Sequence, residues 1–250
     1  MNIAVIFAGG SGQRMRTRDI PKQFLEMHGK PIIIYTLEIF EEHPEIDAIV
    51  IACKKEWIDF LNNLLYKYRI EKVKKVVPGG ETGQMSIYNG LVAASEVSGG
   101  EDAVVLIHDG VRPLITDELI IENIENVKKF GTSITCCSCF ETPIISVDGE
   151  KIDEVLKRDT VYMAKAPQCF HLDEILQAHE KVRNTELGYN NKKIVDSCSL
   201  YMYIGNQVHL TEGNRENIKV TTVEDYISLL ATLSVEDQKQ IFMLKESEKK

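Results

Sequence analysis

Residues 3–24 read IAVIFAGGSGQRMRTRDIPKQF, in which an apolar run leads directly into three glycines and four cationic side chains. The run at 3–7 predicts a buried strand. Glycine lets the following chain turn tightly and brings backbone N–H groups close to a ligand, so a strand that ends in such a loop can cradle phosphates. Arg14 and Lys22 add positive charge near those donors. The stretch therefore predicts a first strand that leads into an anion-binding loop.

Segments of strand and helix character alternate beyond this stretch. Further strands are predicted at 48–53, 73–77, 103–107 and 133–139, and helices at 31–43, 55–68, 85–96, 117–130, 172–183 and 223–233. Such alternation is typical of an α/β fold with a doubly wound, mostly parallel sheet.

One segment departs from this alternation. The stretch IISVDGEKI, residues 144–152, alternates around Asp148 and Gly149, which is typical of a hairpin with a two-residue turn. An antiparallel β-arm is therefore expected at about 141–165. Because no repeat or low-complexity linker divides the 250 residues, residues 1–250 are expected to form a single domain that carries this arm.

Composition excludes several classes of partner. The net charge of −9 argues against nucleic acid, whose backbone needs clustered Lys and Arg. Apolar runs such as AVVLI at 103–107 are too short to span a membrane, and the chain enters a strand at once rather than a signal peptide. We therefore expect a cytoplasmic protein with no membrane partner. The run SITCCSCF at 133–140 lacks a second ligand pair with zinc spacing, which favours reduced core thiols over a metal site.

Four polar clusters follow predicted strands, and in an open parallel sheet the ligand crevice lies at the carboxyl ends of the strands. They are the opening loop, PGGETGQMSIYNGL at 78–91, HDGVRP at 108–113, and NIKVTTVED at 217–225, where Lys219 is expected in a short strand before a helix capped by Thr221 or Thr222. Taken singly, each has a structural alternative, such as a simple turn at Gly79 or a solvated Lys219. Four clusters at one sheet edge favour a ligand site.

The residues also resemble a known family. AGGSGQRM, PKQFL, GKPIIIYTLEIF, GG with SIYNGL, HDGVRP, APQCF and NIKVTTVED occur in the order found in the cytidylyltransferases that activate sugar-alcohol phosphates. The resemblance covers about residues 2–233 and includes two branches, which act on 2-C-methyl-D-erythritol 4-phosphate and on D-ribitol 5-phosphate. It implies a Rossmann-like nucleotidyltransferase fold, the substrates CTP and a polyol phosphate, release of pyrophosphate, a Mg²⁺ cofactor, and a homodimer in which the arm crosses to the second subunit.

The resemblance also implies roles for residues at matching positions. Arg14 and Lys22 match transition-state stabilisers, although one extra residue lies between them, whereas Arg158 and Lys219 match residues that hold the incoming polyol phosphate. The expected nucleotide-binding residues are Phe7, Ala8, Gly9, Gly10, Gly79, Gly80, Glu81, Thr82, Gly83, Gln84, Ser86, Asp109 and Gly110. The expected substrate-binding residues are Arg112, Thr142 and Asp196, with Arg158 and Thr142 acting in the neighbouring subunit. Asp109 is expected to bind Mg²⁺ directly or through water, or to hold a ribose hydroxyl.

Several positions depart from the erythritol branch, which commonly has HDAARP, an Arg in the GG loop and TPQ. Here the residues are Gly110 with Val111, Gly83, and Ala166, and Asp196 follows a valine. These differences favour ribitol phosphate and the product CDP-ribitol, with the erythritol phosphate as the alternative. A hexose 1-phosphate nucleotidyltransferase and a catalytically silent nucleotide-binding protein remain as further alternatives, against which PKQF and the pair Arg158 and Lys219 argue.

Overall fold

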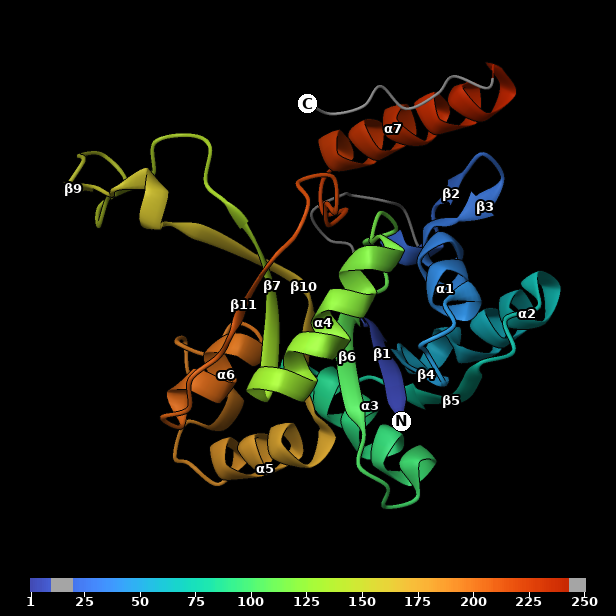
Figure 1. Ribbon diagram of the computed structural model, residues 1–250, viewed down its shortest axis with the longest axis horizontal. Helices are drawn as coiled ribbons and strands as arrows, with labels where there is room; N and C mark the ends of the chain where they lie inside the picture. Colours follow the sequence, from blue (N-terminus) through green and yellow to red (C-terminus); the bar gives the residue numbers. More distant parts are fainter. Residues whose placement is uncertain (10–19, 243–250) are drawn as a thin grey trace.

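A seven-stranded sheet with the strand order β11-β7-β10-β6-β1-β4-β5 runs through the computed structural model (Figure 1). The structure describes residues 1–9 and 20–242, with side chains as far as residue 234. The strands are β1 Asn2–Ala8, β4 Ala48–Cys53, β5 Val73–Pro78, β6 Val104–Asp109, β7 Thr132–Ser138, β10 Tyr162–His171 and β11 Leu210–Glu212. Among these described strands β10 alone pairs antiparallel with its neighbours. The mostly parallel α/β sheet predicted from the sequence is confirmed.

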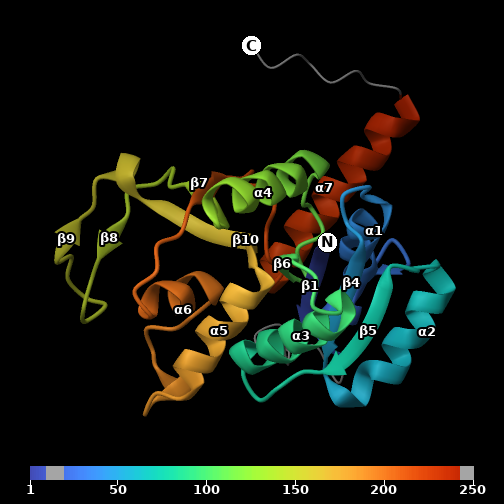
Figure 2. The same ribbon diagram turned by 60° about the horizontal axis from the view of Figure 1, so that its bottom comes forward.

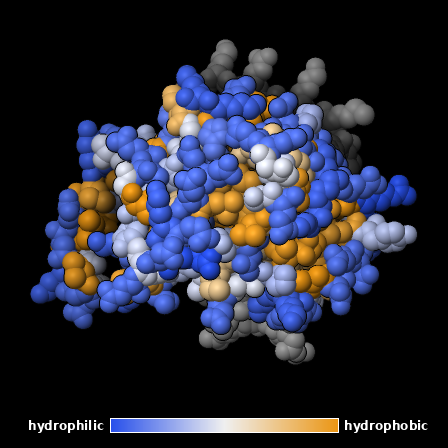
Figure 3. All heavy atoms as spheres, turned by 90° about the horizontal axis from the view of Figure 1, so that it is seen from below, coloured by the Kyte–Doolittle hydropathy of each residue, from blue (hydrophilic) through white to orange (hydrophobic). Residues whose placement is uncertain are grey.

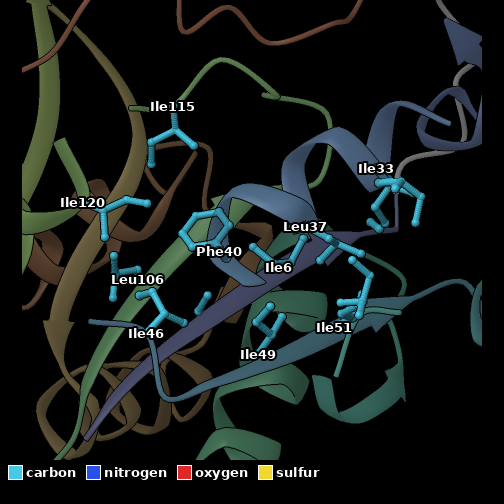
Figure 4. Packing of buried hydrophobic residues seen from close by; sticks show 14 of the residues in the cluster. Ile6, Ile33, Leu37, Phe40, Ile46, Ile49, Ile51, Leu106, Ile115 and Ile120 are labelled. Atoms are coloured by element: carbon cyan, nitrogen blue, oxygen red, sulfur yellow. The ribbon is translucent and has the colours of Figure 1, made fainter. Parts of the chain in front are cut away.

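Helices cover both faces of the sheet because its central strands are apolar on both sides. Ala4 and Ile6 of β1 pack on the face of α1, α2 and α4, whereas Ile3 and Val5 pack on the face of α3, α5 and α6. Figure 4 shows the first of these layers, in which Leu37 and Phe40 lie over Ile6. The helices are α1 Ile32–Glu42, α2 Ile58–Tyr68, α3 Gly83–Ser98, α4 Asp117–Phe130, α5 Leu172–Arg183, α6 Ser197–Tyr203 and α7 Val223–Phe242.

Short elements complete the fold. These are β2 Glu26–Met27, β3 Lys30–Pro31, β8 Ile144–Ile145 and β9 Glu154–Val155, with single turns of 3-10 helix, η2 Lys22–Phe24, η3 Lys55–Trp57, η4 Arg158–Thr160 and η5 Gly188–Asn190. Leu229 of α7 packs with Met27 and Val220 in a small core of its own. No helix within the described residues is long and apolar enough to cross a membrane.

Strands β10 and β11 and helix α6 are among the elements that were not predicted. Strand β10 contains Pro167, which removes a backbone donor and ordinarily argues against a central strand. The sheet accommodates it because the β10–β7 register shifts between Ala164 and Gln168. Strand β11 and helix α6 are too short to give a clear periodic pattern.

The arm is present, but the predicted two-residue turn at Asp148 and Gly149 is wrong. Ile144 of β8 pairs with Val155 of β9, so residues 146–153 form a longer loop between the strands. The carboxylate of Asp148 accepts hydrogen bonds from the backbone N–H groups of Glu150 (2.8 Å) and Lys151 (2.9 Å). Such local side-chain bonds stabilise an alternative to the tight hairpin turn.

The arm projects from the body of the molecule (Figures 1 and 2), and its apolar side chains are exposed. Hydrophobic atoms gather on it at the left of Figure 3. The exposed fractions are 50% for Ile144, 40% for Ile145, 87% for Val147, 63% for Ile152 and 60% for Val155. Within one chain the arm therefore does not fold back to bury these side chains on the sheet.

The cysteines are free thiols, and those in β4, β7 and β10 are mostly core residues. Cys53, Cys136, Cys137 and Cys169 are buried. Burial raises the pKa of the Cys53 and Cys136 thiols to about 11, so they stay protonated near neutral pH. Over residues 1–9 and 20–234, no three His, Cys, Asp or Glu side chains are grouped as ligands for a metal ion.

Candidate active site

A cleft of about 430 Å³ opens at the carboxyl ends of β1 and β6. Its walls are formed by Phe7 of β1, by the start of α3, and by β10 together with the segment before α6. Its lining residues are Phe7, Thr82, Gly83, Gln84, Ile87, Ile107, Asp109, Arg112, Ala164, Lys165, Ala166, Gln168, Tyr189, Ile194, Val195, Asp196, Ser197 and Lys219. The cleft lies where the parallel topology predicts a ligand crevice.

Asp109 lines this cleft and lies between two cations. Its side chain is 6% exposed, and its carboxylate accepts from Arg112 Nε at 2.8 Å and contacts Lys219 Nζ at 2.5 Å. Burial alone would raise the pKa of Asp109, but the neighbouring Lys219 ammonium and Arg112 guanidinium more than offset it and hold the pKa below its ordinary value. Asp109 is therefore ionised at neutral pH, and the two cations outnumber it.

His108 helps to fix Arg112 beneath the cleft. Burial lowers the pKa of His108 to about 4, so the ring is neutral at neutral pH. Its Nε2 lies 3.1 Å from the carbonyl oxygen of Arg112, and since a carbonyl only accepts, Nε2 carries the proton. Arg112 in turn donates from Nη1 to the carbonyl oxygen of Asn217 at 2.9 Å. The guanidinium is thus held by Asp109 at Nε and by the carbonyl oxygen of Asn217 at Nη1.

Lys219 reaches the cleft from an extended segment, and the short strand predicted around it is wrong. Residues 217–220 form no ladder, although Val220 N donates to Val111 O at 3.0 Å. The Lys219 side chain is 37% exposed and its Nζ lies 5.6 Å from the centre of the Phe7 ring. The helix that follows begins as predicted, because Thr222 Oγ1 accepts from Asp225 N at 3.2 Å.

Lys22 lies next to the same segment, at the start of η2. Its Nζ donates to Val220 O at 2.9 Å. Gln23, which is buried, donates from Nε2 to Ala8 O at 2.5 Å, and the Phe24 ring stacks on Trp57 at 5.1 Å between centroids. These contacts anchor the turn PKQF against the end of β1, which brings the side chains of Lys22 and Lys219 to one edge of the sheet.

The loop before α3 is shaped by two hydroxyl groups. Ser86 Oγ accepts from Gly80 N at 3.0 Å and donates to Thr82 O at 3.0 Å. Thr82 caps the helix by accepting from Met85 N at 3.1 Å. Gln84 is buried against the cleft, and its Oε1 receives no hydrogen bond from any residue that the structure describes. Gln84 thus lines the cleft, whereas Ser86 acts on the loop from behind it.

Gly80 is required by this loop, because an added Cβ would collide with Cβ of Met85. We expect Gly80→Ala to lower the free energy of unfolding by about 1–3 kcal/mol, as overpacking does. Gly83→Ala is the matched control, since a Cβ there meets nothing within 4 Å and alanine favours the helix start. Thermal unfolding of both variants is the measurement. Equal melting temperatures would contradict the assignment of strain to Gly80.

The predicted site residues fall into four groups, of which the last is the pair carried by the arm. Those that line the cleft are Phe7, Thr82, Gly83, Gln84, Asp109, Arg112, Asp196 and Lys219. Those that lie beside it or behind it in the described chain are Ala8, Gly9, Lys22, Gly79, Gly80, Glu81, Ser86 and Gly110. Gly10 and Arg14 lie outside the described residues.

Arg158 and Thr142 are the two predicted site residues that the arm carries. Both are exposed, and neither lines the cleft of its own chain. Arg158 Nη1 donates to Phe140 O at 3.2 Å, a contact within the base of the arm. Within a single chain these two residues are therefore not brought to the other site residues.

Asp196 has a structural role that the sequence reasoning missed. It is the N-cap of α6, where its Oδ1 accepts from Ser199 N at 2.8 Å in a capping box. Its Oδ2 accepts from Gln168 Nε2 at 2.8 Å. The spacing of Asp196 and Ser199 was the signal that could have identified this cap. Gln168, Lys165 and Tyr189 also line the cleft without having been predicted.

The chain is similar to known proteins in sequence and in fold. Residues 2–235 match the IspD family, 2-C-methyl-D-erythritol 4-phosphate cytidylyltransferase. Ribitol-5-phosphate cytidylyltransferase of Vibrio parahaemolyticus serotype O3:K6 is 49% identical, over 97% of this chain and 100% of the relative. 2-C-methyl-D-erythritol 4-phosphate cytidylyltransferase of Clostridium botulinum (strain Okra / Type B1) is 38% identical, over 90% and 94%. The crystal structure of 4-diphosphocytidyl-2C-methyl-D-erythritol synthase from Anaerococcus prevotii has a TM-score of 0.78 at 30% identity, over 93% and 96%.

Proposed function

The chain belongs to the IspD family of cytidylyltransferases, and on that premise we propose that it joins CTP and D-ribitol 5-phosphate to give CDP-ribitol and pyrophosphate. The observation that carries this proposal is the cluster of Asp109, Arg112 and Lys219 at the carboxyl ends of β1 and β6. The higher identity to relatives named for ribitol 5-phosphate, 49% against 38%, supports that polyol over the erythritol phosphate.

The proposed reaction is an in-line attack of the polyol phosphate on the α-phosphorus of CTP, with pyrophosphate as the leaving group. A phosphate monoester has a second pKa of about 6 and is mostly a dianion at neutral pH, so the nucleophile needs no general base. The site must instead hold two anions that repel each other and neutralise the charge that develops. Lys22, Lys219 and Arg112 supply that positive charge in this proposal, as does Arg14 in the opening loop.

Asp109 suits the proposed Mg²⁺ cofactor. Mg²⁺ commonly binds through one or two carboxylates together with substrate phosphates, rather than in a cage made by the protein alone. The single ionised carboxylate of Asp109 beside the cations fits that pattern. When bound, Mg²⁺ would neutralise charge on the triphosphate, and Asp109 would hold it directly or through water.

We also propose a homodimer in which the arm of each chain completes the cleft of the other. The exposed apolar side chains of the arm need a surface to pack on, and an isologous pairing would cover both arms at once. Arg158 and Thr142 lie on the arm, so they would then reach the partner's polyol phosphate. A cytoplasmic location stays a prediction.

The nucleotide preference tests the proposed function. Ser86 Oγ holds the N–H of Gly80 and the carbonyl oxygen of Thr82, which fixes the backbone of the loop at 79–83. In the proposal, a fixed loop that accepts a hydrogen bond from the cytosine amino group cannot rearrange to donate one to the uracil carbonyl. We expect kcat/KM for CTP to exceed that for UTP by on the order of a hundredfold or more, since the wrong base leaves buried polar groups unpaired.

The measurement is the rate of pyrophosphate release with CTP or UTP. Each nucleotide is paired with ribitol 5-phosphate, 2-C-methyl-D-erythritol 4-phosphate or a hexose 1-phosphate. Turnover of ribitol 5-phosphate above the others is the expected result. A preference for the erythritol phosphate would move the assignment to the other branch of the family, and equal turnover of CTP and UTP would contradict it.

A further inference from the structure

Lys165 of β10 lines the cleft, yet its ammonium group is directed at the main chain. Its Nζ donates to the carbonyl oxygens of Asn214 at 3.2 Å, Arg215 at 2.9 Å and Asn217 at 3.4 Å. An ammonium group has three protons, and here three acceptors match them. The side chain therefore clamps the turn at 213–217 to β10.

This turn has little regular structure to hold it. Strand β11 ends at Glu212 and α7 begins at Val223, and residues 213–222 between them form neither helix nor strand. A second bond supports the clamp, because the buried side chain of Asn217 donates from Nδ2 to Ala166 O at 2.7 Å. Two consecutive residues of β10, Lys165 and Ala166, thus fasten the same turn.

The turn carries the groups that organise the cleft. The carbonyl oxygen of Asn217 accepts from Lys165 Nζ and also from Arg112 Nη1 at 2.9 Å. Two residues further on, Lys219 Nζ lies 2.5 Å from Asp109. A shift of the turn would therefore move Lys219 and remove one of the two bonds that hold the Arg112 guanidinium.

The environment of Lys165 is consistent with a clamp. The side chain is half-buried, and burial lowers its pKa because the ammonium has lost part of its hydration. The three carbonyl oxygens replace that water. Direct capture of a phosphate by Lys165 would require these bonds to break.

We propose that Lys165 is a positioning residue, which fixes the turn at 213–217 so that Arg112 and Lys219 keep the geometry that the polyol phosphate requires. The inference rests on the proposed role of Lys219 in holding that phosphate. Misplacement of a reacting group by about 1 Å can lower a rate on the order of a hundredfold, so the loss of a clamp is measurable.

Lys165→Met keeps the unbranched stem and removes the ammonium. We expect kcat/KM for ribitol 5-phosphate to fall by about ten- to a hundredfold, with KM for CTP changed by less than about threefold. Lys165→Arg should recover most of the activity, because a guanidinium can still donate to several carbonyls. Lys128→Met, at an exposed lysine on α4, is the matched control and should match the wild type.

Hydrogen exchange separates positioning from direct binding. In Lys165→Met without substrates, amides of residues 213–220 should exchange about tenfold faster than in the wild type, whereas Lys219→Ala should leave exchange at residues 213–217 at the wild-type rate. Reduced activity with unchanged exchange would overturn the proposal in favour of direct contact with substrate. Unchanged activity and exchange would overturn it outright.

Two further outcomes are distinguishable. If Lys219→Ala kept wild-type kcat/KM, the proposed role of Lys219 would fail whatever Lys165→Met does. If Lys219→Ala were impaired and Lys165→Met were not, only the inference on Lys165 would fail. Should Lys165→Met not fold, Lys165→Gln, whose shorter and uncharged side chain lacks the ammonium, takes its place in the same measurements.

Discussion

Lys22→Ala should lower kcat by about a hundred- to a thousandfold, which is the typical effect of removing a group that stabilises developing charge. Lys22 Nζ donates to the carbonyl oxygen of Val220, the residue that follows Lys219 in the sequence. Its ammonium is therefore placed at the edge where the triphosphate is proposed to bind. Arg14→Ala, in the opening loop, should have an effect of the same order, because both cations are assigned to the same developing charge.

Steady-state kinetics of pyrophosphate release measure this effect. KM for the polyol phosphate should change much less than kcat, because the interaction strengthens in the transition state. The fold should survive in Lys22→Ala, since Gln23 and Phe24 anchor the turn through their own contacts. Lys74→Ala, at an exposed lysine of β5, is the matched control. If Lys22→Ala and Arg14→Ala both kept near-normal kcat, the opening loop would be only a structural turn.

Much of the fold was predictable because the central strands are buried on both faces. The side chains of the apolar runs at β1, β4 and β6 can be buried on both faces only between two layers of helices. The sequence shows this need for burial because these runs are apolar at every position. Strand β10 was not predictable in this way, because Pro167 argues against a strand until the register shift beside it is known. The predicted turn at the tip of the arm was wrong because Asp148 accepts a hydrogen bond from its own loop, which stabilises a longer loop than a two-residue turn.

The position of the site was more predictable than its detailed contacts. Parallel topology places the carboxyl ends of β1 and β6 together, so the grouping of Asp109 with Phe7 follows from the order of elements. Which side chains then enter the cleft depends on helix phase, which is why Gln84 lines it and Ser86 lies behind it. The role of Lys165 could not be predicted, because its three partners are backbone carbonyls 49, 50 and 52 residues away in the sequence.

Mixing two inactive variants should restore activity if the arm acts in the partner's site. Arg158→Ala chains keep Lys22, and Lys22→Ala chains keep Arg158. In a hybrid dimer, the cleft of the Arg158→Ala chain would use its own Lys22 and the Arg158 of the partner subunit. Random pairing makes half the dimers hybrid, with one intact cleft in each, so about a quarter of wild-type activity should return.

The same experiment has an internal control in a second pair of variants. Lys22 and Lys219 meet at Val220 within one chain, so a mixture of Lys22→Ala and Lys219→Ala chains creates no cleft with both lysines. That mixture should stay as inactive as its parents, while exchange of differently tagged subunits is followed by affinity capture. If the Arg158→Ala and Lys22→Ala mixture also stayed inactive after demonstrated exchange, Arg158 would not act across the dimer. Arg158 would then have to act within its own chain, where it lies exposed on the arm and outside the cleft.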